Sequence, residues 1–266
     1  ISRRCIKRLF SKAIIVVEIK TKRKRVKFAS DNVTGACPEV LDAILKANDE
    51  DRTPYGNDEL SKNLQNKFSE IFEKEVIVFP TASGTAANAL ALSTMTPSFG
   101  NIYCHRLSHI NVDECGAPEF YTGGAKLVNL DGINGKIIPE ELDDSISGKG
   151  IVHHTQPSSV SITQLCETGV AYQLDEIKKI SEVAHKHKLN IHMDGARFAN
   201  AIVSLNCSPA EMTWKSGIDV LSFGATKNGC FAAEAIIFFN KDLVGNLPFL
   251  MKRACLLYTS PSPRDI

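Results

Sequence analysis

The sequence predicts an α/β domain built on a mainly parallel β-sheet that is covered by helices. Short apolar runs alternate along the chain with longer segments of helical periodicity. The 266 residues are 43% hydrophobic and 23% charged, as in a globular protein with one large core. No apolar run approaches the roughly 18 residues of a membrane-spanning helix, so we expect no membrane span.

The strands are expected where apolar and β-branched residues cluster. These runs cover residues 76–79, 102–103, 126–130, 160–163, 190–193, 220–223 and 235–239. Helices are expected at residues 83–95, which are rich in helix formers, and from Pro139, since proline suits the first turn. A third helix is expected at residues 174–188, because Ile177, Ile180 and Ala184 share one face with Leu174.

The two ends of the chain differ from its middle. Residues 1–27 carry a charge of +10 and the remainder −9, so we expect a flexible basic extension there. The stretch LLYTSPSPRDI (256–266) has no periodicity and is expected to be a non-native tail. We therefore predict a large domain at residues 28–245, followed by residues outside it.

The eight cysteines form no CxxC pair and are irregularly spaced. That pattern argues against a zinc ribbon or a disulfide framework. Several of them lie in apolar surroundings, as reduced core cysteines do. We expect a reducing compartment and a cytoplasmic location.

Polar residues of unusual type follow several predicted strands, where ligands gather in parallel sheets. In TASGTAAN, residues Ser83, Gly84 and Thr85 open a helix and would offer backbone N–H groups to a phosphate. The loop lacks the lysine and spacing of a Walker loop, so no nucleoside triphosphate is implied. The alternative is a serine N-cap with a glycine for close packing.

A second loop, HMDGARFAN, places Asp194 at the end of an apolar strand and Arg197 just beyond it. Charges in such a place need partners. The two side chains could pair with each other, or the acid could face a protonated ring nitrogen and the arginine an anion.

A third loop, LSFGATKNGC, holds one lysine, Lys227, among small and apolar residues. Such surroundings lower the proton affinity of an amine, and a neutral amine can form a Schiff base. The alternative is a lysine that extends to solvent. His109, in RLSHINVDECG, is by itself an ordinary polar loop residue, unless a planar cofactor needs a ring to stack on it.

Together these loops supply what pyridoxal 5′-phosphate requires. A lysine holds its aldehyde, an acid keeps its pyridine nitrogen protonated, and a helix N-terminus holds its phosphate. Lys227 follows Asp194 by 33 residues, and both follow the phosphate loop. The sequence therefore predicts an enzyme that uses this cofactor.

The sequence also resembles the L-threonine aldolase family of fold-type I pyridoxal-phosphate enzymes, in the beta-eliminating lyase/threonine aldolase superfamily. The matching stretches lie in the family's order within residues 28–239: FASDNVTGACPEVLDAI, DRTPYGND, PTASGTAANALAL, HINVDECGAPEF, NIHMDGARFANA and LSFGATKNGC. The resemblance implies a large domain of the aspartate aminotransferase type with three α/β/α layers. It also implies cleavage of L-threonine or L-allo-threonine to glycine and acetaldehyde.

The resemblance assigns roles to single residues. Lys227 would bind the cofactor covalently, Asp194 would pair with the pyridine nitrogen, and His109 would stack on the ring. Gly84 and Thr85, with Ser83, would hold the phosphate.

It likewise implies how substrate and subunits meet. Arg197 would lie near the cofactor's oxygen and the substrate carboxylate, and Ser30 at that carboxylate. Tyr55 would reach the cofactor of a neighbouring subunit, which implies a homodimer or homotetramer with shared active sites.

The chain departs from the family's pattern in two places. One branch has a second active-site histidine after the strand at residues 160–163, where this chain reads QLCETG with Glu167. The base that takes the substrate's hydroxyl proton is thus His109, Glu167 or a held water. The family also continues into a small domain that supplies another arginine. We expect residues 246–266 to hold only its truncated start and the tail.

Other readings stay open. The scaffold could serve another lyase reaction on β-hydroxy or β-substituted amino acids. The chain could instead be an inactive fragment, or a nucleic-acid binder that uses its basic arm. That arm has one aromatic residue, Phe10, and little capacity for base stacking, so we expect no nucleic-acid partner. We expect no metal, because His185 and His187 do not share a helix face and no ligand set is complete.

Overall fold

A computed structural model describes residues 29–33, 35–48 and 53–255 of the chain. The chain divides into two compact units, Ile1–Val33 and Thr34–Ile266. The described part of the first unit contains one 3₁₀ turn, η1 (Asp31–Val33). The basic segment 1–27 and the tail 256–266 lie outside the described residues. The predicted boundaries of the large domain stay a prediction.

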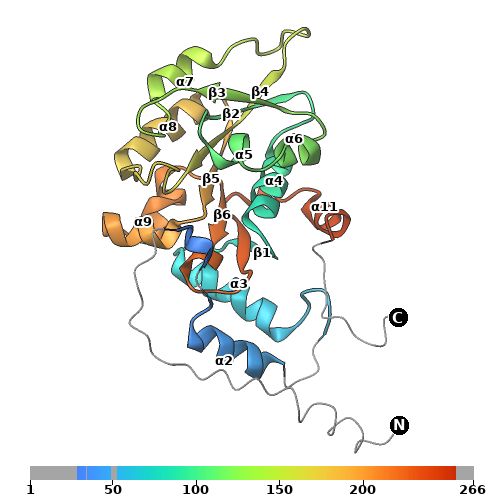
Figure 1. Cartoon of the computed structure of the whole chain (residues 1–266). Coiled ribbons are helices and arrows are strands. Elements are labelled where there is room, and N and C mark those ends of the chain that lie inside the picture. Colours follow the sequence, from blue (N-terminus) through green and yellow to red (C-terminus); the bar gives the residue numbers. More distant parts are fainter. Residues whose placement is uncertain (1–28, 34, 49–52, 256–266) are drawn as a thin grey trace, which may run out of the picture. The chain divides into compact units, whose positions relative to one another are not determined.

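The second unit is built on a seven-stranded sheet of order β1-β7-β6-β5-β4-β2-β3 (Figure 1). The strands are β1 (Ile77–Thr81), β2 (Gly100–His105), β3 (Lys126–Leu130), β4 (Gln156–Thr163), β5 (Asn190–Gly195), β6 (Val220–Gly224) and β7 (Glu234–Phe238). Strands β3, β2, β4, β5 and β6 pair in parallel, and β7 runs antiparallel to both β6 and β1. Each of the seven predicted strands is present, and the mainly parallel sheet is confirmed.

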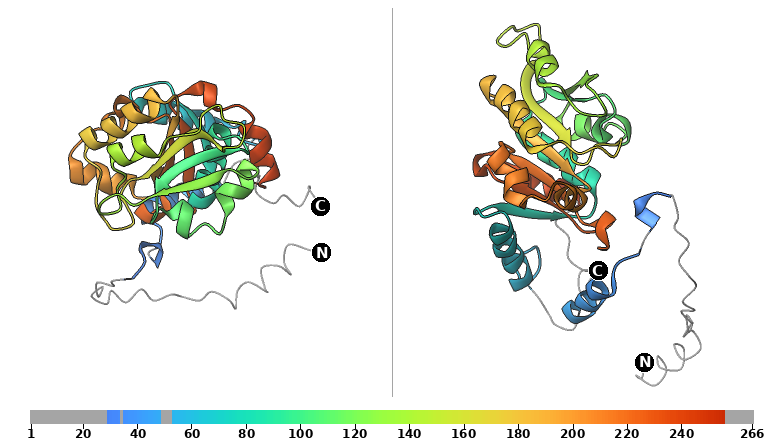
Figure 2. Two further views of the ribbon diagram at one scale, coloured as in Figure 1. Left: turned by 90° about the horizontal axis from the view of Figure 1, so that it is seen from above. Right: turned by 90° about the vertical axis from the view of Figure 1, so that its left-hand side faces the viewer.

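Helices cover both faces of the sheet, while α2 (Pro38–Ala47) precedes the first strand and has no buried residue (Figure 2). The described helices are α2, α3 (Glu59–Ile71), α4 (Gly84–Met95), α5 (His109–Val112), α6 (Ala117–Thr122), α7 (Pro139–Ser145), α8 (Leu174–Lys186), α9 (Phe198–Leu205), α10 (Pro209–Met212) and α11 (Leu247–Arg253), with 3₁₀ turns η2 (Trp214–Ser216), η3 (Thr226–Asn228) and η4 (Lys241–Leu243). The three predicted helices correspond to α4, α7 and α8. None of the described helices is long and apolar enough to cross a membrane.

Two apolar cores lie on opposite faces of the sheet. One gathers side chains of α3, α7, α8 and α9, including Phe72 and Ile180, against Ile162 and Met193 of the sheet. The other packs α4 and α11 against Ile236 and the residues beside it on the same face. Alternate residues of a strand point to opposite faces, so Ile236 and Ile237 serve different cores.

The α4 face of the central strands is polar in its middle. On β5, Ile191 and Met193 face the first core, while His192 and Asp194 point the other way. His192 is fully buried, and its ring nitrogens lie 2.9 Å from Ser161 Oγ and 2.8 Å from Ser222 Oγ. These hydrogen bonds link three neighbouring strands directly below the edge that carries Asp194.

Candidate active site at the carboxyl edge of the sheet

The ends of four strands and the start of a fifth meet at one edge of the sheet. Thr163 of β4 pairs with Asp194 of β5, which pairs with Ser222 near the end of β6. Thr81 and Gly224, the last residues of β1 and β6, both pair with Glu234, the first residue of β7. Loops that carry the predicted site residues leave from this edge, so residues distant in sequence come close together.

Asp194 is buried at this edge and both of its carboxylate oxygens are hydrogen-bonded. Oδ1 accepts the backbone N–H of Ala196 at 3.0 Å, and Oδ2 accepts the side-chain amide of Asn88 at 2.8 Å. A buried carboxylate with fixed donors is held in one orientation. This arrangement does not require a pair with Arg197 to satisfy the acid.

Asn88, on α4, joins Asp194 to a second buried acid. Its amide nitrogen also donates to Oε1 of Glu114 at 2.8 Å. The Glu114 side chain is 0% exposed, and burial is the main cause that raises its pKa. Its other oxygen, Oε2, has no hydrogen-bond partner among the described residues. One amide thus holds two carboxylates close together.

His109 begins α5 and completes this chain of contacts. Its Nδ1 lies 2.8 Å from Glu114 Oε1, and the side chain keeps 37% exposure. The hydrogen bond to Glu114 is the main cause that raises the pKa of His109, with a smaller effect of Asp194 in the same direction. The positive charge of Lys227 acts in the opposite direction.

Glu167 follows β4 and also reaches His109. Its Oε1 accepts the backbone N–H of His109 at 2.7 Å, while Oε2 is buried without a partner among the described residues. Burial is the main cause that raises the pKa of Glu167. The carboxyl therefore fixes the first residue of α5 and brings an acid to the same edge.

The predicted phosphate loop lies between β1 and α4. Ser83 is the N-cap of α4, and its Oγ accepts the N–H of Ala86 at 3.2 Å. Gly84 and Thr85 are half-buried in the first turn. The first four backbone N–H groups of a helix lack partners within the helix, and an N-cap side chain accepts only one of them. Ser83 can therefore cap α4 while other N–H groups remain for a phosphate.

Lys227 lies in η3, directly after β6, and is half-buried. The backbone of Gly224, which precedes this turn, packs closely against the loop at Ala196. A Cβ on Gly224 would lie 2.7 Å from the Cα of Ala196, too close for any other residue without a shift. The predicted lysine and the predicted acid thus leave adjacent strands at the same edge.

The structure also describes three other predicted residues. Arg197 is the N-cap residue of α9, three positions beyond Asp194. Ser30 belongs to the first unit, where its Oγ accepts the N–H of Asn32 at 3.3 Å. Tyr55 is 55% exposed, with Lys252 Nζ 5.3 Å from the centre of its ring. Their proposed roles stay predictions.

His109, Glu114 and Asp194 could also be read as metal ligands, since their ligand atoms lie within 4.8 Å of one another. However, the amide of Asn88 donates to both carboxylates from between them. A cation between the two carboxylates would therefore lie against the N–H groups of the Asn88 amide, which carry partial positive charge. The prediction that no metal is used remains a prediction.

Sequence reasoning missed three members of this edge: Asn88, Glu114 and Glu234. Asn88 interrupts a run of Ala and Leu (residues 86–92), which is a signal for a buried polar contact. Glu114 follows His109 by five positions, a distance that gives no signal without the turn that ends α5. Glu234 looks like the polar start of an apolar strand.

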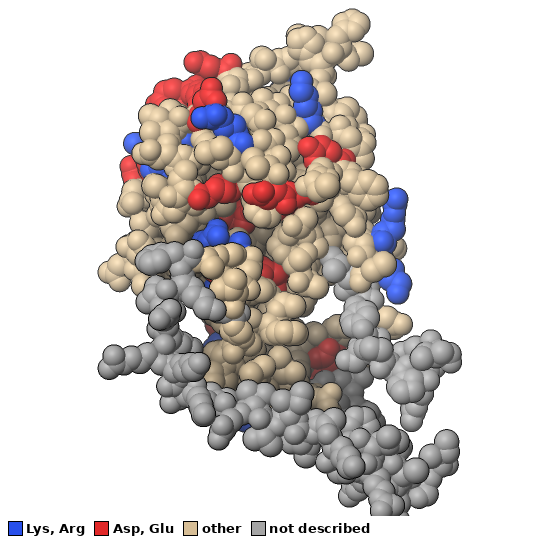
Figure 3. Space-filling model, viewed as in Figure 1, with Lys and Arg blue, Asp and Glu red and all other residues tan. Residues whose placement is uncertain are grey.

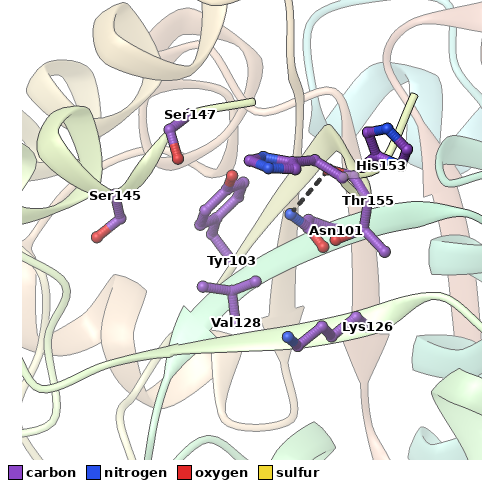
Figure 4. Close-up of a pocket in the computed structure, with 9 residues that line it drawn as sticks. Asn101, Tyr103, Lys126, Val128, Ser145, Ser147, His153 and Thr155 are labelled. Carbon is purple, nitrogen blue, oxygen red and sulfur yellow. Dashed lines mark hydrogen bonds between the residues drawn. The ribbon is translucent and has the colours of Figure 1, made fainter. Parts of the chain in front are cut away.

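A surface hollow of about 410 Å³ lies elsewhere, near the beginnings of β2, β3 and β4 (Figure 4). Asn101, Tyr103, Lys126 and Thr155 are among its lining residues, and the amide of Asn101 donates to Thr155 O at 3.5 Å. It contains none of the predicted site residues. The chemistry predicted from the sequence belongs to the opposite ends of these strands.

Comparison with known proteins decides the family. The sequence profile described as beta-eliminating lyase matches residues 27–257. The chain belongs to the beta-eliminating lyase family. A low specificity L-threonine aldolase of Pseudomonas sp. (strain NCIMB 10558) is 44% identical over 227 residues, which are 85% of this chain and 66% of that protein. This chain therefore spans slightly less than two thirds of that relative's length.

Solved structures of the family and its neighbours agree. The threonine aldolase of Leishmania major is 28% identical with a TM-score of 0.79, over 85% of this chain and 66% of that one. Cystalysin from Treponema denticola, whose structure contains pyridoxal 5′-phosphate, has 14% identity and a TM-score of 0.57, over 85% of this chain and 61% of that one. The fold-type I, aspartate aminotransferase-like architecture predicted from the sequence is confirmed.

Proposed function

We propose that this beta-eliminating lyase family member uses pyridoxal 5′-phosphate to cleave L-threonine or L-allo-threonine to glycine and acetaldehyde. The observation that carries the proposal is the buried Asp194, held by Asn88 at the strand edge from which Lys227 leaves. The relative from Pseudomonas sp. is named for this reaction. The cystalysin structure contains the same cofactor on the same fold.

The residues present fit that cofactor. Lys227 would bind it, Asp194 would face the pyridine nitrogen, and His109 would cover the ring. Ser83, Gly84 and Thr85 would hold the phosphate at the start of α4, where a helix favours negative charge. When bound, pyridoxal phosphate supplies an electron sink that accepts the electron pair of a broken bond at the amino acid's Cα.

Asp194 is suited to hold a proton on a neighbouring nitrogen. A carboxylate stabilises an adjacent positive charge, and it does so more strongly when water is excluded. Asn88 and Ala196 fix its two oxygens, so little reorganisation is needed during the reaction. This is the role that the sequence predicted for the acid.

His109 is the base that the contacts support best. With its Nδ1 proton donated to Glu114, its Nε2 carries a free lone pair that can accept the proton of the substrate's β-hydroxyl. Glu114 stabilises the imidazolium that results. Glu167 accepts the backbone N–H of His109 and so serves to position that residue.

The substrate's carboxylate and the assembly belong to the proposal as well. Arg197 and Ser30 would bind the carboxylate, since guanidinium and hydroxyl groups suit that anion. Tyr55 is exposed on this chain, which supports a role at a neighbour's site in a homodimer or homotetramer. The seven described cysteines are unpaired, which supports a cytoplasmic location.

The nucleic-acid alternative has less support. The basic segment lies outside the described residues. On the face seen in Figure 3, the described surface carries acidic and basic side chains interspersed. A duplex or single strand is bound by a continuous basic surface.

Product analysis tests the proposed reaction. The full chain, supplied with pyridoxal phosphate and L-threonine, should release glycine and acetaldehyde in equal amounts. Release of ammonia and an α-keto acid would instead assign β-elimination to the site. Absence of both products, with the cofactor bound, would assign an inactive fragment.

A further inference from the structure

Glu234 lies between the proposed phosphate loop and the lysine turn. Its backbone pairs with Thr81, two residues before Ser83, and with Gly224, three residues before Lys227. β7 runs antiparallel to both of these strands, so its first residue is placed where they end.

The side chain of Glu234 points toward the start of α4. Its Oε2 would lie 3.9 Å from a Cβ built on Gly84 and 3.0 Å from one built on Gly224. Thr226 and Lys227 act to lower the pKa of the carboxyl, and the charge of Asp194 acts to raise it. The carboxyl therefore lies on the cofactor side of the sheet edge, next to the helix N-terminus that would receive a phosphate.

A phosphate bound at this N-terminus would lie next to the carboxyl group of Glu234. When that carboxyl is ionised, both groups are negatively charged. Two anions in contact repel unless a proton lies between them. Burial already raises the pKa of Glu234, with Asp194 adding to the rise, and it outweighs the opposing effects of Thr226 and Lys227. A second anion would favour the neutral carboxyl further.

We propose that Glu234 contacts the cofactor's phosphate as a neutral carboxyl group, which donates its proton in a hydrogen bond to a phosphate oxygen. This inference rests on the proposed function, because it requires the cofactor to bind at Gly84. It makes Glu234 a binding residue that links cofactor affinity to pH. When the carboxyl ionises, the hydrogen bond becomes a repulsion and the affinity falls.

The test measures the binding of pyridoxine 5′-phosphate to the full chain between pH 6 and 9. This probe lacks the aldehyde, so it forms no bond to Lys227. The variant Glu234→Gln keeps a hydrogen-bond donor but cannot ionise. Because the probe and all other groups titrate alike in both proteins, their effects cancel in the ratio of dissociation constants. Loss of one linked proton raises that ratio, wild type over variant, by up to about tenfold per pH unit above the pKa of Glu234.

Glu73→Gln is the matched control, since it removes one exposed acid that pairs with Lys215 on the surface. It should follow the wild type at every pH. Parallel curves for the wild type and Glu234→Gln would overturn the role of Glu234 while leaving cofactor binding intact. Absence of probe binding in every protein would overturn the cofactor proposal and this inference together.

A second measurement needs only the wild type and tests the proposal even if Glu234→Gln does not fold. Calorimetric titration of the wild type at pH 8, in two buffers of different ionisation enthalpy, counts the protons taken up on binding. Uptake with pyridoxine 5′-phosphate and none with pyridoxine, which has no phosphate, is expected. Equal proton counts for the two probes would overturn the proposal.

Discussion

Nδ1 of His109 lies 2.8 Å from Oε1 of Glu114, and the same oxygen accepts the amide of Asn88. This contact fixes the ring and orients its other nitrogen. It also ties the proposed base to Asp194 through a single amide. Changes at Glu114 should therefore alter both the protonation of His109 and the orientation of its ring.

The pH profile tests this pair. Glu114 raises the pKa of His109 above its ordinary value of 6.5. A base must be neutral to accept a proton, so kcat should rise as pH increases through that raised pKa. In Glu114→Gln the pKa should fall, so the rising limb should move to lower pH. Its plateau should drop about tenfold or more, since general base catalysis contributes roughly 10²- to 10⁴-fold.

The conservative variant Glu114→Asp serves as the control for this experiment. It keeps the charge and should retain a limb closer to that of the wild type. An unmoved limb in Glu114→Gln would show that His109 does not titrate as the base.

Lys227 can be identified chemically. Borohydride reduces a lysine Schiff base to a stable bond, so treatment of the cofactor-loaded chain should label the peptide that contains Lys227. Lys227→Ala should lose turnover and label, while its unfolding midpoint stays close to that of the wild type. A label on another lysine, for instance Lys252, would contradict the assignment.

Asp194→Asn tests the acid. An amide lacks the negative charge that stabilises a protonated ring nitrogen, so the chemical step should slow by about 100-fold or more, as for other fixed electrostatic groups. Cofactor affinity should weaken in parallel. Stopped-flow absorbance and equilibrium titration measure the two effects. Near-normal turnover would show that Asp194 serves only to fix Asn88 and the loop at Ala196.

The sequence predicted the strands better than the contacts between their ends. Periodicity located β3 at Lys126–Leu130 and the other strands within a few residues, because each buries apolar side chains. It gave Asp194 and Lys227 as candidates, because polar residues after apolar runs are conspicuous, while His109 became a candidate through the family resemblance. Asn88 and Glu114 stayed hidden, because their pairing depends on how α4 and α5 approach the sheet.

The antiparallel direction of β7 is the other feature that local sequence patterns do not predict. An apolar run at residues 235–239 predicts a strand but not its direction. Direction depends on the length of the connection, and a short turn after Lys227 lets β7 return beside β6. That return brings Glu234 to the cofactor edge.

Subunit mixing tests the proposed shared site. Tyr55→Phe and Lys227→Ala chains, each impaired alone, are combined and allowed to exchange. If Tyr55 completes a neighbour's site, a mixed dimer has one site with both defects and one with neither. Activity should then exceed that of either parent preparation. A mixture that gives only their average would place the action of Tyr55 within its own chain.

His192 should control the stability of the fold at mildly acidic pH. It is fully buried between Ser161 and Ser222, and burial lowers its pKa from 6.5 to about 4. Between these values the unfolded chain binds a proton that the folded chain does not, so stability is lost as pH falls. The loss by pH 4 should be about 3 kcal/mol, since one pKa unit corresponds to about 1.4 kcal/mol.

Urea unfolding at pH 7.5 and at pH 4.5 measures this loss. His192→Gln keeps hydrogen-bonding groups near both serines but cannot gain a proton. Its free energy of unfolding should start lower at pH 7.5, because the fit is poorer, and then change less between the two pH values than that of the wild type. His153→Gln is the control, since it makes the same change at an exposed histidine. An equal loss in wild type and His192→Gln would assign the acid sensitivity to other groups, such as the paired carboxylate of Asp143.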